Sequence, residues 1–225
     1  MRRKCLSFVL RSIAVPRAIY SRLLRMELEF KIAHVGRRFI YDPPSSVFVT
    51  PESISIGNYV FLNKGAYLSG DITFRKNIMC GPFLTVLAGS HIYGVRGKST
   101  RFIRRSAENP EVLRPVVVED EVWIGANVML VGPLTVGVGA VIGAGSVVVK
   151  DVPPLTVAVG NPCRAVRRVF DDPGAVEHLV ALGYSLQAAN DIVARRAQML
   201  ADLELPVFDV TQTCCPFLYN PDGSA

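Results

Sequence analysis

A six-residue repeat runs through much of the chain and constrains its fold more than any other feature. Between Val118 and Val148, every sixth residue is apolar with a branched side chain. The residue four positions after each of these is small or medium-sized. A helix repeats about every 3.6 residues and a strand about every 2, so this period fits only short straight faces joined by turns. Such a repeat is typical of a β-helix, in which inward side chains stack coil upon coil.

The same repeat occurs earlier in the chain, from Ile56 to Val86. Val86 and Val118 lie 32 residues apart, which is two more than five repeats. The segment between the two blocks therefore cannot be continuous coil. We expect residues 91–115 to leave the solenoid as an excursion, with His91 at its root.

The character of the sequence changes at both ends of the repeat region. We predict three parts: a basic, helical N-terminal segment (1–47), a β-helix domain (48–168) and a C-terminal helical extension with a tail (169–225). In the last part, apolar residues spaced by three and four predict one or two helices between 175 and 205.

The basic charge of the chain is concentrated near its N-terminus. Residues 1–38 hold ten Lys or Arg against two Glu, whereas the whole chain carries a net charge of +6. Apolar runs there fall short of the roughly 20 residues that a membrane span requires. Two roles stay open: a helix that caps the open end of the solenoid, or a basic amphipathic helix lying on an anionic membrane surface.

Three motifs in the second block carry a family resemblance: VWIGANV (122–128), VIGAGSVVVKDVPP (141–154) and VGNPCRAVRR (159–168). With them, the chain resembles the hexapeptide-repeat acyltransferases, most of all the galactoside, maltose and nodulation-factor O-acetyltransferases. The resemblance implies a mainly β fold, a left-handed parallel β-helix with three hexads per coil. It also implies acetyl-CoA as acyl donor and a homotrimer with its sites between subunits.

His91 is the candidate catalytic residue. An unperturbed imidazole has a pKa of about 6.5 and can take a proton from a hydroxyl at neutral pH. By position alone, His91 could equally be a histidine that merely begins a loop, but the family's catalytic histidine occupies this place. The resemblance implies direct transfer, in which His91 deprotonates an acceptor hydroxyl that attacks the thioester of acetyl-CoA.

The sequence offers no alternative nucleophile. It contains no GxSxG motif, and Cys80 falls on an inward repeat position. The five cysteines, with Cys214 and Cys215 adjacent, form no disulfide framework and indicate cytosolic thiols. The oxyanion needs backbone donors, for which the resemblance suggests Gly125 and Ala126.

Two further residues are predicted to contact the acceptor. Asn63 resembles the family asparagine that lies beside the histidine. The alternative is a β-helix corner, because Asn tolerates left-handed backbone angles. Trp123, the sole tryptophan, is outward in the repeat phase, which indicates a subunit interface or the acceptor cleft.

Five residues are predicted to bind the acetyl donor. A pantetheine arm can lie along stacked coils only where side chains are short, as at Ala126 and Ala144, although every coil also needs small residues at its corners. Lys150, Arg164 and Arg167 lie where the family meets the phosphates of CoA, and cations suit phosphate there. Solvated surface charge is the alternative for these three.

The sequence therefore predicts a cytoplasmic, acetyl-CoA dependent O-acetyltransferase acting on a saccharide or glycan precursor, with peripheral contact to the inner membrane face if the basic segment binds there. The basic excursion and N-terminus favour an acidic or lipid-linked acceptor. An N-acetyltransferase acting on an amino sugar and a non-catalytic β-helix scaffold with a membrane-binding arm stay as alternatives. The carbonic anhydrases that share the solenoid need three zinc-binding histidines, but only His91 falls within the coils, so we expect no metal. GVGAVIGAG (137–145) lacks the GxGxxG spacing of a dinucleotide-binding loop, so we do not predict a Rossmann fold. We also expect no nucleic-acid partner.

Overall fold

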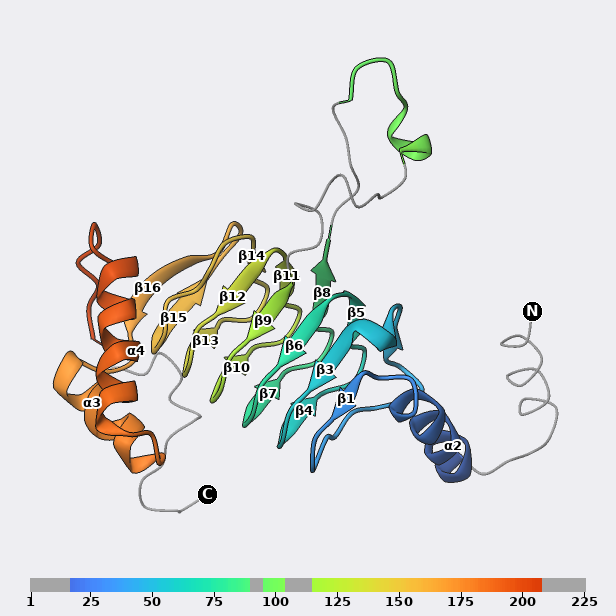
Figure 1. Cartoon of the computed structure of the whole chain (residues 1–225), viewed down its shortest axis with the longest axis horizontal. Coiled ribbons are helices and arrows are strands. Elements are labelled where there is room, and N and C mark those ends of the chain that lie inside the picture. Colours follow the sequence, from blue (N-terminus) through green and yellow to red (C-terminus); the bar gives the residue numbers. More distant parts are fainter. Residues whose placement is uncertain (1–16, 90–94, 104–114, 208–225) are drawn as a thin grey trace, which may run out of the picture.

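The computed structural model describes residues 17–89, 95–103 and 115–207, in which the chain winds as a three-sided solenoid (Figure 1). Each side is a sheet of short strands contributed by successive coils. Sheet A holds β1 (His34–Val35), β3 (Ile54–Ile56), β6 (Ile72–Phe74), β9 (Val116–Val118) and β12 (Leu134–Val136). Sheet B holds β4 (Val60–Leu62), β7 (Ile78–Cys80), β10 (Trp123–Ile124), β13 (Val141–Ile142), β15 (Thr156–Val159) and β16 (Arg164–Arg168). Sheet C holds β2 (Val47–Phe48), β5 (Tyr67–Gly70), β8 (Thr85–Ala88), β11 (Met129–Val131) and β14 (Val147–Val148).

One coil takes 18 residues, or three hexads. Ile54 pairs with Ile72 in sheet A, and Val60 pairs with Ile78 in sheet B, in both cases with parallel strands. After the last coil, β16 folds back antiparallel to β15. The predicted fold class, a mainly β left-handed parallel β-helix with helical extensions at both ends, is confirmed.

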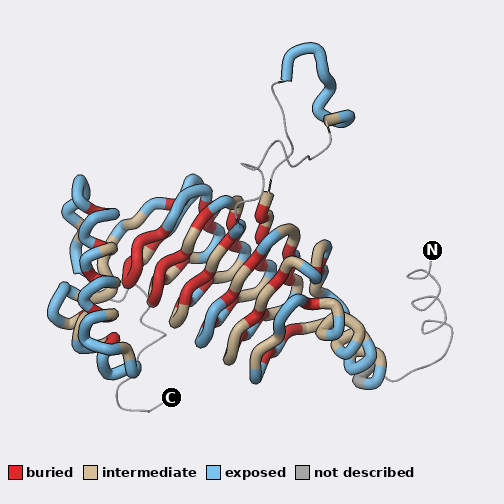
Figure 2. The backbone as a smooth tube through the Cα atoms, viewed as in Figure 1, coloured by how far each residue is buried: buried red, intermediate tan, exposed pale blue. Residues whose placement is uncertain are grey.

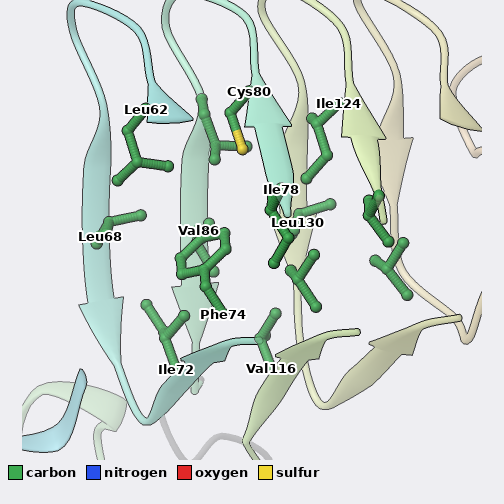
Figure 3. Close-up of a cluster of buried hydrophobic side chains, with 14 of the residues drawn as sticks. Leu62, Leu68, Ile72, Phe74, Ile78, Cys80, Val86, Val116, Ile124 and Leu130 are labelled. Atoms are coloured by element: carbon green, nitrogen blue, oxygen red, sulfur yellow. The ribbon is translucent and has the colours of Figure 1, made fainter. Parts of the chain in front are cut away.

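The inward hexad positions form the core. All twelve residues of the register that contains Val86 and Val118 are at most 1% exposed. Figure 3 shows Leu62, Cys80 and Ile124, which follow one another on adjacent strands of sheet B. Fully burying one such apolar side chain stabilises a fold by about 1.5–3 kcal/mol. The ladder of inward residues is therefore the main stabilising feature of the solenoid.

The excursion leaves the solenoid without disturbing the stacking of coils. β8 ends at Ala88 and β9 begins at Val116. Ile72 pairs with Val116, 44 residues later, where other coils return after 18. Of the excursion, residues 95–103 are described, including the short 3-10 helix η2 (Thr100–Phe102), and they stand clear of the coils in Figure 1.

The corners of the solenoid use left-handed backbone conformations, including some at large side chains. Tyr59 (φ 59°) marks the corner between sheets A and B, and Phe83 (φ 62°) marks the corner between sheets B and C. Gly65 takes the equivalent place to Phe83 one coil earlier, and a Cβ there would lie 2.4 Å from the Phe83 ring. The glycine is needed because the aromatic ring covers it.

The N-terminal end of the solenoid is closed by α2 (Arg17–Glu29) and an aromatic cluster. Leu28 packs against the core. The Tyr41 ring lies 4.6 Å from that of Phe39 and 5.6 Å from that of Phe48, between ring centroids. The Arg25 guanidinium donates to the Tyr41 carbonyl at 3.2 Å and lies 5.1 Å from the centre of its ring. The helix thus caps the solenoid, one of the two roles predicted for this segment.

The C-terminal extension folds as two helices, α3 (Asp172–Ala181) and α4 (Leu186–Met199), in agreement with the prediction. Both begin at a capping side chain, since Asp171 accepts from the Gly174 N–H and Ser185 from the Ala188 N–H. The pair packs against the last coils through a second apolar cluster. Its buried members are Val138, Leu155, Ala175, Leu179, Ala189 and Val193.

A buried carboxylate fastens this helix pair to the solenoid. Glu119, 5% exposed, follows β9 and accepts hydrogen bonds from the Val138 N–H and from both terminal nitrogens of Arg195 on α4. Burial alone would raise the pKa of Glu119, but the bonds from Arg195 and Val138, with Arg75 nearby, hold it below its usual value. Glu119 is therefore charged in the folded protein at neutral pH.

The described part of the chain holds no helix with the length and apolar character that crossing a bilayer demands.

Candidate active site

The predicted site residues lie mainly along two edges of the solenoid. The strands of sheet C are parallel, so they all begin at the edge shared with sheet B and all end at the edge shared with sheet A. We call these the BC edge and the CA edge. A four-residue strand such as β5 separates them by about 13 Å.

The BC edge is a column of small residues. A Cβ added to Gly125 would lie 2.6 Å from the backbone nitrogen of Ala144, and one added to Gly81 would lie 2.7 Å from that of Ala126. The Ala126 carbonyl accepts from the Gly145 N–H at 2.8 Å. Ala126 and Ala144 therefore stand directly above one another on successive coils, with only a methyl group each.

Asn63 lies on the same edge, at the place that Gly81 takes one coil later. Its N–H donates to the Cys80 carbonyl at 3.2 Å, and its Oδ1 accepts from the Lys64 N–H at 2.8 Å. Two coil steps of about 4.8 Å separate its coil from that of Ala126. The Asn63 side chain thus accepts a hydrogen bond from the backbone of its own corner. Its contact with an acceptor stays a prediction.

The excursion departs from the CA edge. Beneath its root, a Cβ on Gly70 would lie 2.0 Å from the Ala88 carbonyl oxygen, so only glycine fits there. Above the root, the Gly132 N–H donates to the Leu87 carbonyl at 3.0 Å. His91 lies outside the described residues, and its catalytic role stays a prediction. Lys150 is exposed and follows β14 at this same edge.

Trp123 lies on the outer face of sheet B, where it is 49% exposed. It belongs to a row of half-exposed apolar residues in strict register along the sheet: Ile40, Phe61, Met79 and Trp123. The corresponding row on the outer face of sheet C is Val47, Tyr67, Thr85 and Met129, which is apolar except for Thr85. The matching row of sheet A is Ser55, Thr73, Val117 and Thr135. The BC edge is thus flanked on both sides by mainly apolar rows, whereas three of the four residues in the row of sheet A carry hydroxyl groups.

Arg164 and Arg167 lie on β16, at different distances from the BC edge. Arg164 pairs with Val159, the last residue of β15, and donates to the Cys163 carbonyl at 2.8 Å. It is therefore at the BC edge. Arg167 pairs with Val157 further back along the strand. The two arginines do not form one cluster with Lys150, which lies across sheet C.

The backbone and thiol groups of this region limit the chemistry available. Burial raises the pKa of the Cys80 thiol and of the Cys163 thiol, so neither forms a thiolate nucleophile at neutral pH. The Gly125 N–H donates to the Ile142 carbonyl at 2.8 Å. The suggestion that Gly125 is an oxyanion donor is therefore wrong, because the stacking of coils already uses this N–H.

One residue at the BC edge, Phe83, was not predicted from the sequence as part of the site. Phe83 is 50% exposed, and the Lys64 ammonium lies 5.9 Å from the centre of its ring. The signal was present in the repeat, because Phe83 occupies the hexad place held elsewhere by Gly65, Asn127 and Gly145. An aromatic residue in that place extends the edge outward where other coils have little or no side chain.

Known proteins similar to this chain are acetyltransferases. No family model matches the chain. The galactoside O-acetyltransferase of Escherichia coli K12 is 32% identical over 141 residues, which cover 62% of this chain and 65% of that enzyme. The chain spans 57–65% of the length of curated relatives such as this one.

Solved structures give the same result for the fold. A hexapeptide-repeat acetyltransferase of Vibrio cholerae, solved with acetyl-CoA, aligns with a TM-score of 0.52 and 28% identity, over 64% of this chain and 75% of that one. A maltose O-acetyltransferase of Clostridium difficile 630 aligns with a TM-score of 0.54 and 26% identity, over 76% and 87%. In sequence the chain is similar to acetyltransferases, and in fold it is similar to acetyltransferases that include a hexapeptide-repeat enzyme.

Proposed function

We propose that the chain is an acetyl-CoA dependent O-acetyltransferase that acetylates a hydroxyl of a saccharide or glycan precursor in the cytoplasm. The observation that carries this proposal is the column of small residues on the BC edge, in a solenoid whose relatives are acetyltransferases. A pantetheine arm is thin and needs a straight path free of side chains. Ala126 and Ala144 provide such a path on adjacent coils.

The cations near this path suit the other end of the donor. Arg164 is exposed at the BC edge, on the second strand beyond β13, which Ala144 follows. A guanidinium there can bind phosphate in a bidentate manner. Lys150 and Arg167 are also assigned to binding the phosphates of CoA, Lys150 from its position at the CA edge.

In the proposed reaction, the imidazole of His91 takes the proton of the acceptor hydroxyl as its oxygen attacks the thioester carbonyl. A tetrahedral intermediate forms, the carbon–sulfur bond breaks, and the thiolate of CoA receives the proton from the imidazolium. The sequence suggested the N–H groups of Gly125 and Ala126 as oxyanion donors. Because the Gly125 N–H bonds to the Ile142 carbonyl, we assign the oxyanion to the Ala126 N–H. Asn63 orients the acceptor beside the histidine.

We further propose that the functional unit is a homotrimer. Within one chain, Asn63, Ala126, Ala144 and Arg164 occupy the BC edge, whereas the excursion and Lys150 occupy the CA edge, about 13 Å away across sheet C. If the BC edge of one copy lies against the CA edge of the next copy, the residues of the two edges come together in one site. Such a head-to-tail contact closes into a ring when repeated with rotation. The apolar rows on sheets B and C supply surface for it.

The acceptor class is inferred from charge. The described part of the excursion exposes Arg96, Lys98 and Arg101. Cations on a segment that faces the acceptor favour an anionic glycan over a neutral sugar. An amino sugar is the competing acceptor, and product analysis distinguishes an ester from an amide.

The test is a thioester-cleavage assay with acetyl-CoA and a panel of neutral, acidic and amino sugars. Replacing His91 by Ala is expected to lower turnover by about 100- to 10,000-fold, the usual contribution of a general base. His34→Ala is the matched control, because His34 is exposed on β1 and has no role in the proposal. Unchanged turnover in His91→Ala would eliminate the mechanism. If the chain cleaves acetyl-CoA but acetylates none of the sugars in the panel, the result would support the donor site and not the proposed acceptor.

A further inference from the structure

The cap helix α2 has two apolar sides, of which only one is used by the fold. Leu24 and Leu28 are partly buried, and Leu28 packs against the core. A second line of four apolar side chains points away from the solenoid. Its members and their exposed fractions are Ile19 (52%), Leu23 (42%), Met26 (62%) and Phe30 (92%).

These four residues, here called the outer stripe, form one narrow face. They are spaced by four, three and four residues, so at about 100° per residue they fall within an arc of roughly 60°. Leu24 and Leu28 lie on the opposite side of the same helix. Phe30 follows the helix directly, and its N–H still donates to the Met26 carbonyl at 3.2 Å. The stripe is thus continuous over three turns.

The contacts of the inner side fix the direction of the outer stripe. Arg25 and Tyr41 bond to each other twice, from the Arg25 guanidinium to the Tyr41 carbonyl and from the Tyr41 hydroxyl to the Arg25 carbonyl. The Arg25 guanidinium also lies over the Tyr41 ring. Rolling the helix to bury the stripe would break all of these contacts. Figure 2 shows α2 at the end of the solenoid with exposed residues along its outer side.

The charge around the stripe is positive. Residues 17–31 hold four basic residues against Glu27 and Glu29. Each glutamate lies near a basic partner, Glu27 with Lys31 and Glu29 with Arg25 at 3.9 Å. Arg22 is exposed beside the stripe. Residues 1–38 together carry a net charge of +8. An apolar stripe flanked by cations is the pattern of helices that lie in the surface of an anionic bilayer.

We infer that the outer stripe of α2 docks the protein on an anionic lipid surface. A second protein copy fits the stripe less well, since a stable protein interface uses roughly 20–30 residues a side, and the stripe offers four. The stripe instead inserts its side chains shallowly among acyl chains while the basic residues meet lipid phosphates. The helix therefore both caps the solenoid and anchors it. This inference is independent of the proposed acetyl transfer.

Co-sedimentation of the full chain with vesicles tests it. One set of vesicles is phosphatidylcholine alone, and the other contains phosphatidylglycerol as a third of its lipid. We expect binding to the second set that weakens as salt rises. The double substitution Met26→Ser and Phe30→Ser is expected to lower binding by at least about tenfold, because it removes two apolar side chains that the bilayer would otherwise bury.

The control is Leu186→Ser with Leu203→Ser, which removes two exposed apolar side chains, 62% and 54% exposed, from the other end of the molecule. It should bind vesicles like the unaltered chain. Acetyl transfer to a soluble acceptor should be unaffected by the stripe substitutions, so failure of one proposal is distinguishable from failure of the other. The inference is overturned if the chain shows no preference for phosphatidylglycerol, or if the stripe variant binds as well as the control. It is also overturned if the stripe variant has a lower mass by light scattering, because the stripe would then join protein copies.

Discussion

Beside the apolar cluster, one carboxylate attaches the C-terminal helices to the solenoid, and replacing Arg195 by Met measures its contribution. The Glu119 side chain is 6% exposed and receives two bonds from Arg195. In the variant it keeps the Val138 N–H at 2.9 Å and the Arg75 guanidinium at 3.8 Å. Removing one partner of a fully buried pair costs about 3–5 kcal/mol. Because the Arg195 side chain is 40% exposed, water can partly replace it, and we expect a loss of about 2–3 kcal/mol.

The assay is urea unfolding at neutral pH, in which the midpoint should fall while the dependence on urea concentration stays constant. For a chain of this size, the expected loss corresponds to a fall in melting temperature of roughly 5–10 °C. Arg75→Met is the control on the same carboxylate. The Arg75 side chain is 53% exposed and its ion pair spans 3.8 Å, so its removal should cost at most about 1 kcal/mol. Equal effects of the two substitutions, or no effect of Arg195→Met, would refute this account of the attachment.

The pairing of Glu119 with Arg195 also makes the free energy of unfolding depend on pH, and the direction of that dependence can be predicted. The pKa of Glu119 in the folded protein is below its ordinary value of 4.5. The charged carboxylate therefore contributes stability that is fully present above the unfolded pKa and is lost as the pH falls through the folded pKa. Compared with Glu119→Gln, the unaltered chain should show a constant difference in unfolding free energy above about pH 5 that shrinks in more acidic solution. A difference that grows with acidity would contradict the assignment.

Two further predictions concern the proposed donor path and the subunit contact. Ala144→Phe adds a ring on the exposed BC edge without filling the core, so the KM for acetyl-CoA should rise at least about tenfold with stability unchanged, whereas Val117→Phe on sheet A should leave that KM unaltered. Met79→Ser combined with Trp123→Ser removes two of the four residues of the apolar row on sheet B, so light scattering should show the proposed trimer dissociating, and a persistent trimer would exclude this row from the contact. Val180→Ser with Leu182→Ser, on the C-terminal helices, is the control, since both side chains are similarly exposed at 44% and 41%.

The repetitive part of the fold could be predicted because every coil obeys one local rule. Each position of the register that runs from Ile56 to Val148 is apolar for the same reason, so the period alone places it. The corners could not be predicted in the same way. Tyr59 and Phe83 adopt left-handed angles that their residue types disfavour, and they do so because the neighbouring coils fix the position of the turn.

The side-chain contacts at the ends of the solenoid and the grouping of site residues could not be predicted from the sequence for a different reason. The pairing of Glu119 with Arg195 joins residues 76 positions apart through side chains that follow no period. Lys150 stands six residues after Ala144, yet the two lie on opposite edges of sheet C. Proximity along the chain does not indicate proximity in space where each coil turns a corner every few residues.

The uninterrupted pairing of β6 with β9 has a consequence for how such a protein can change over time. The coils on either side of the excursion pair directly, in the same parallel arrangement as coils with no insertion between them. Lengthening a flexible insertion costs only about 0.6 kcal/mol for each doubling. Selection can therefore rewrite the inserted residues while the scaffold that holds them stays intact, and under the proposed function such changes would alter which acceptor is used.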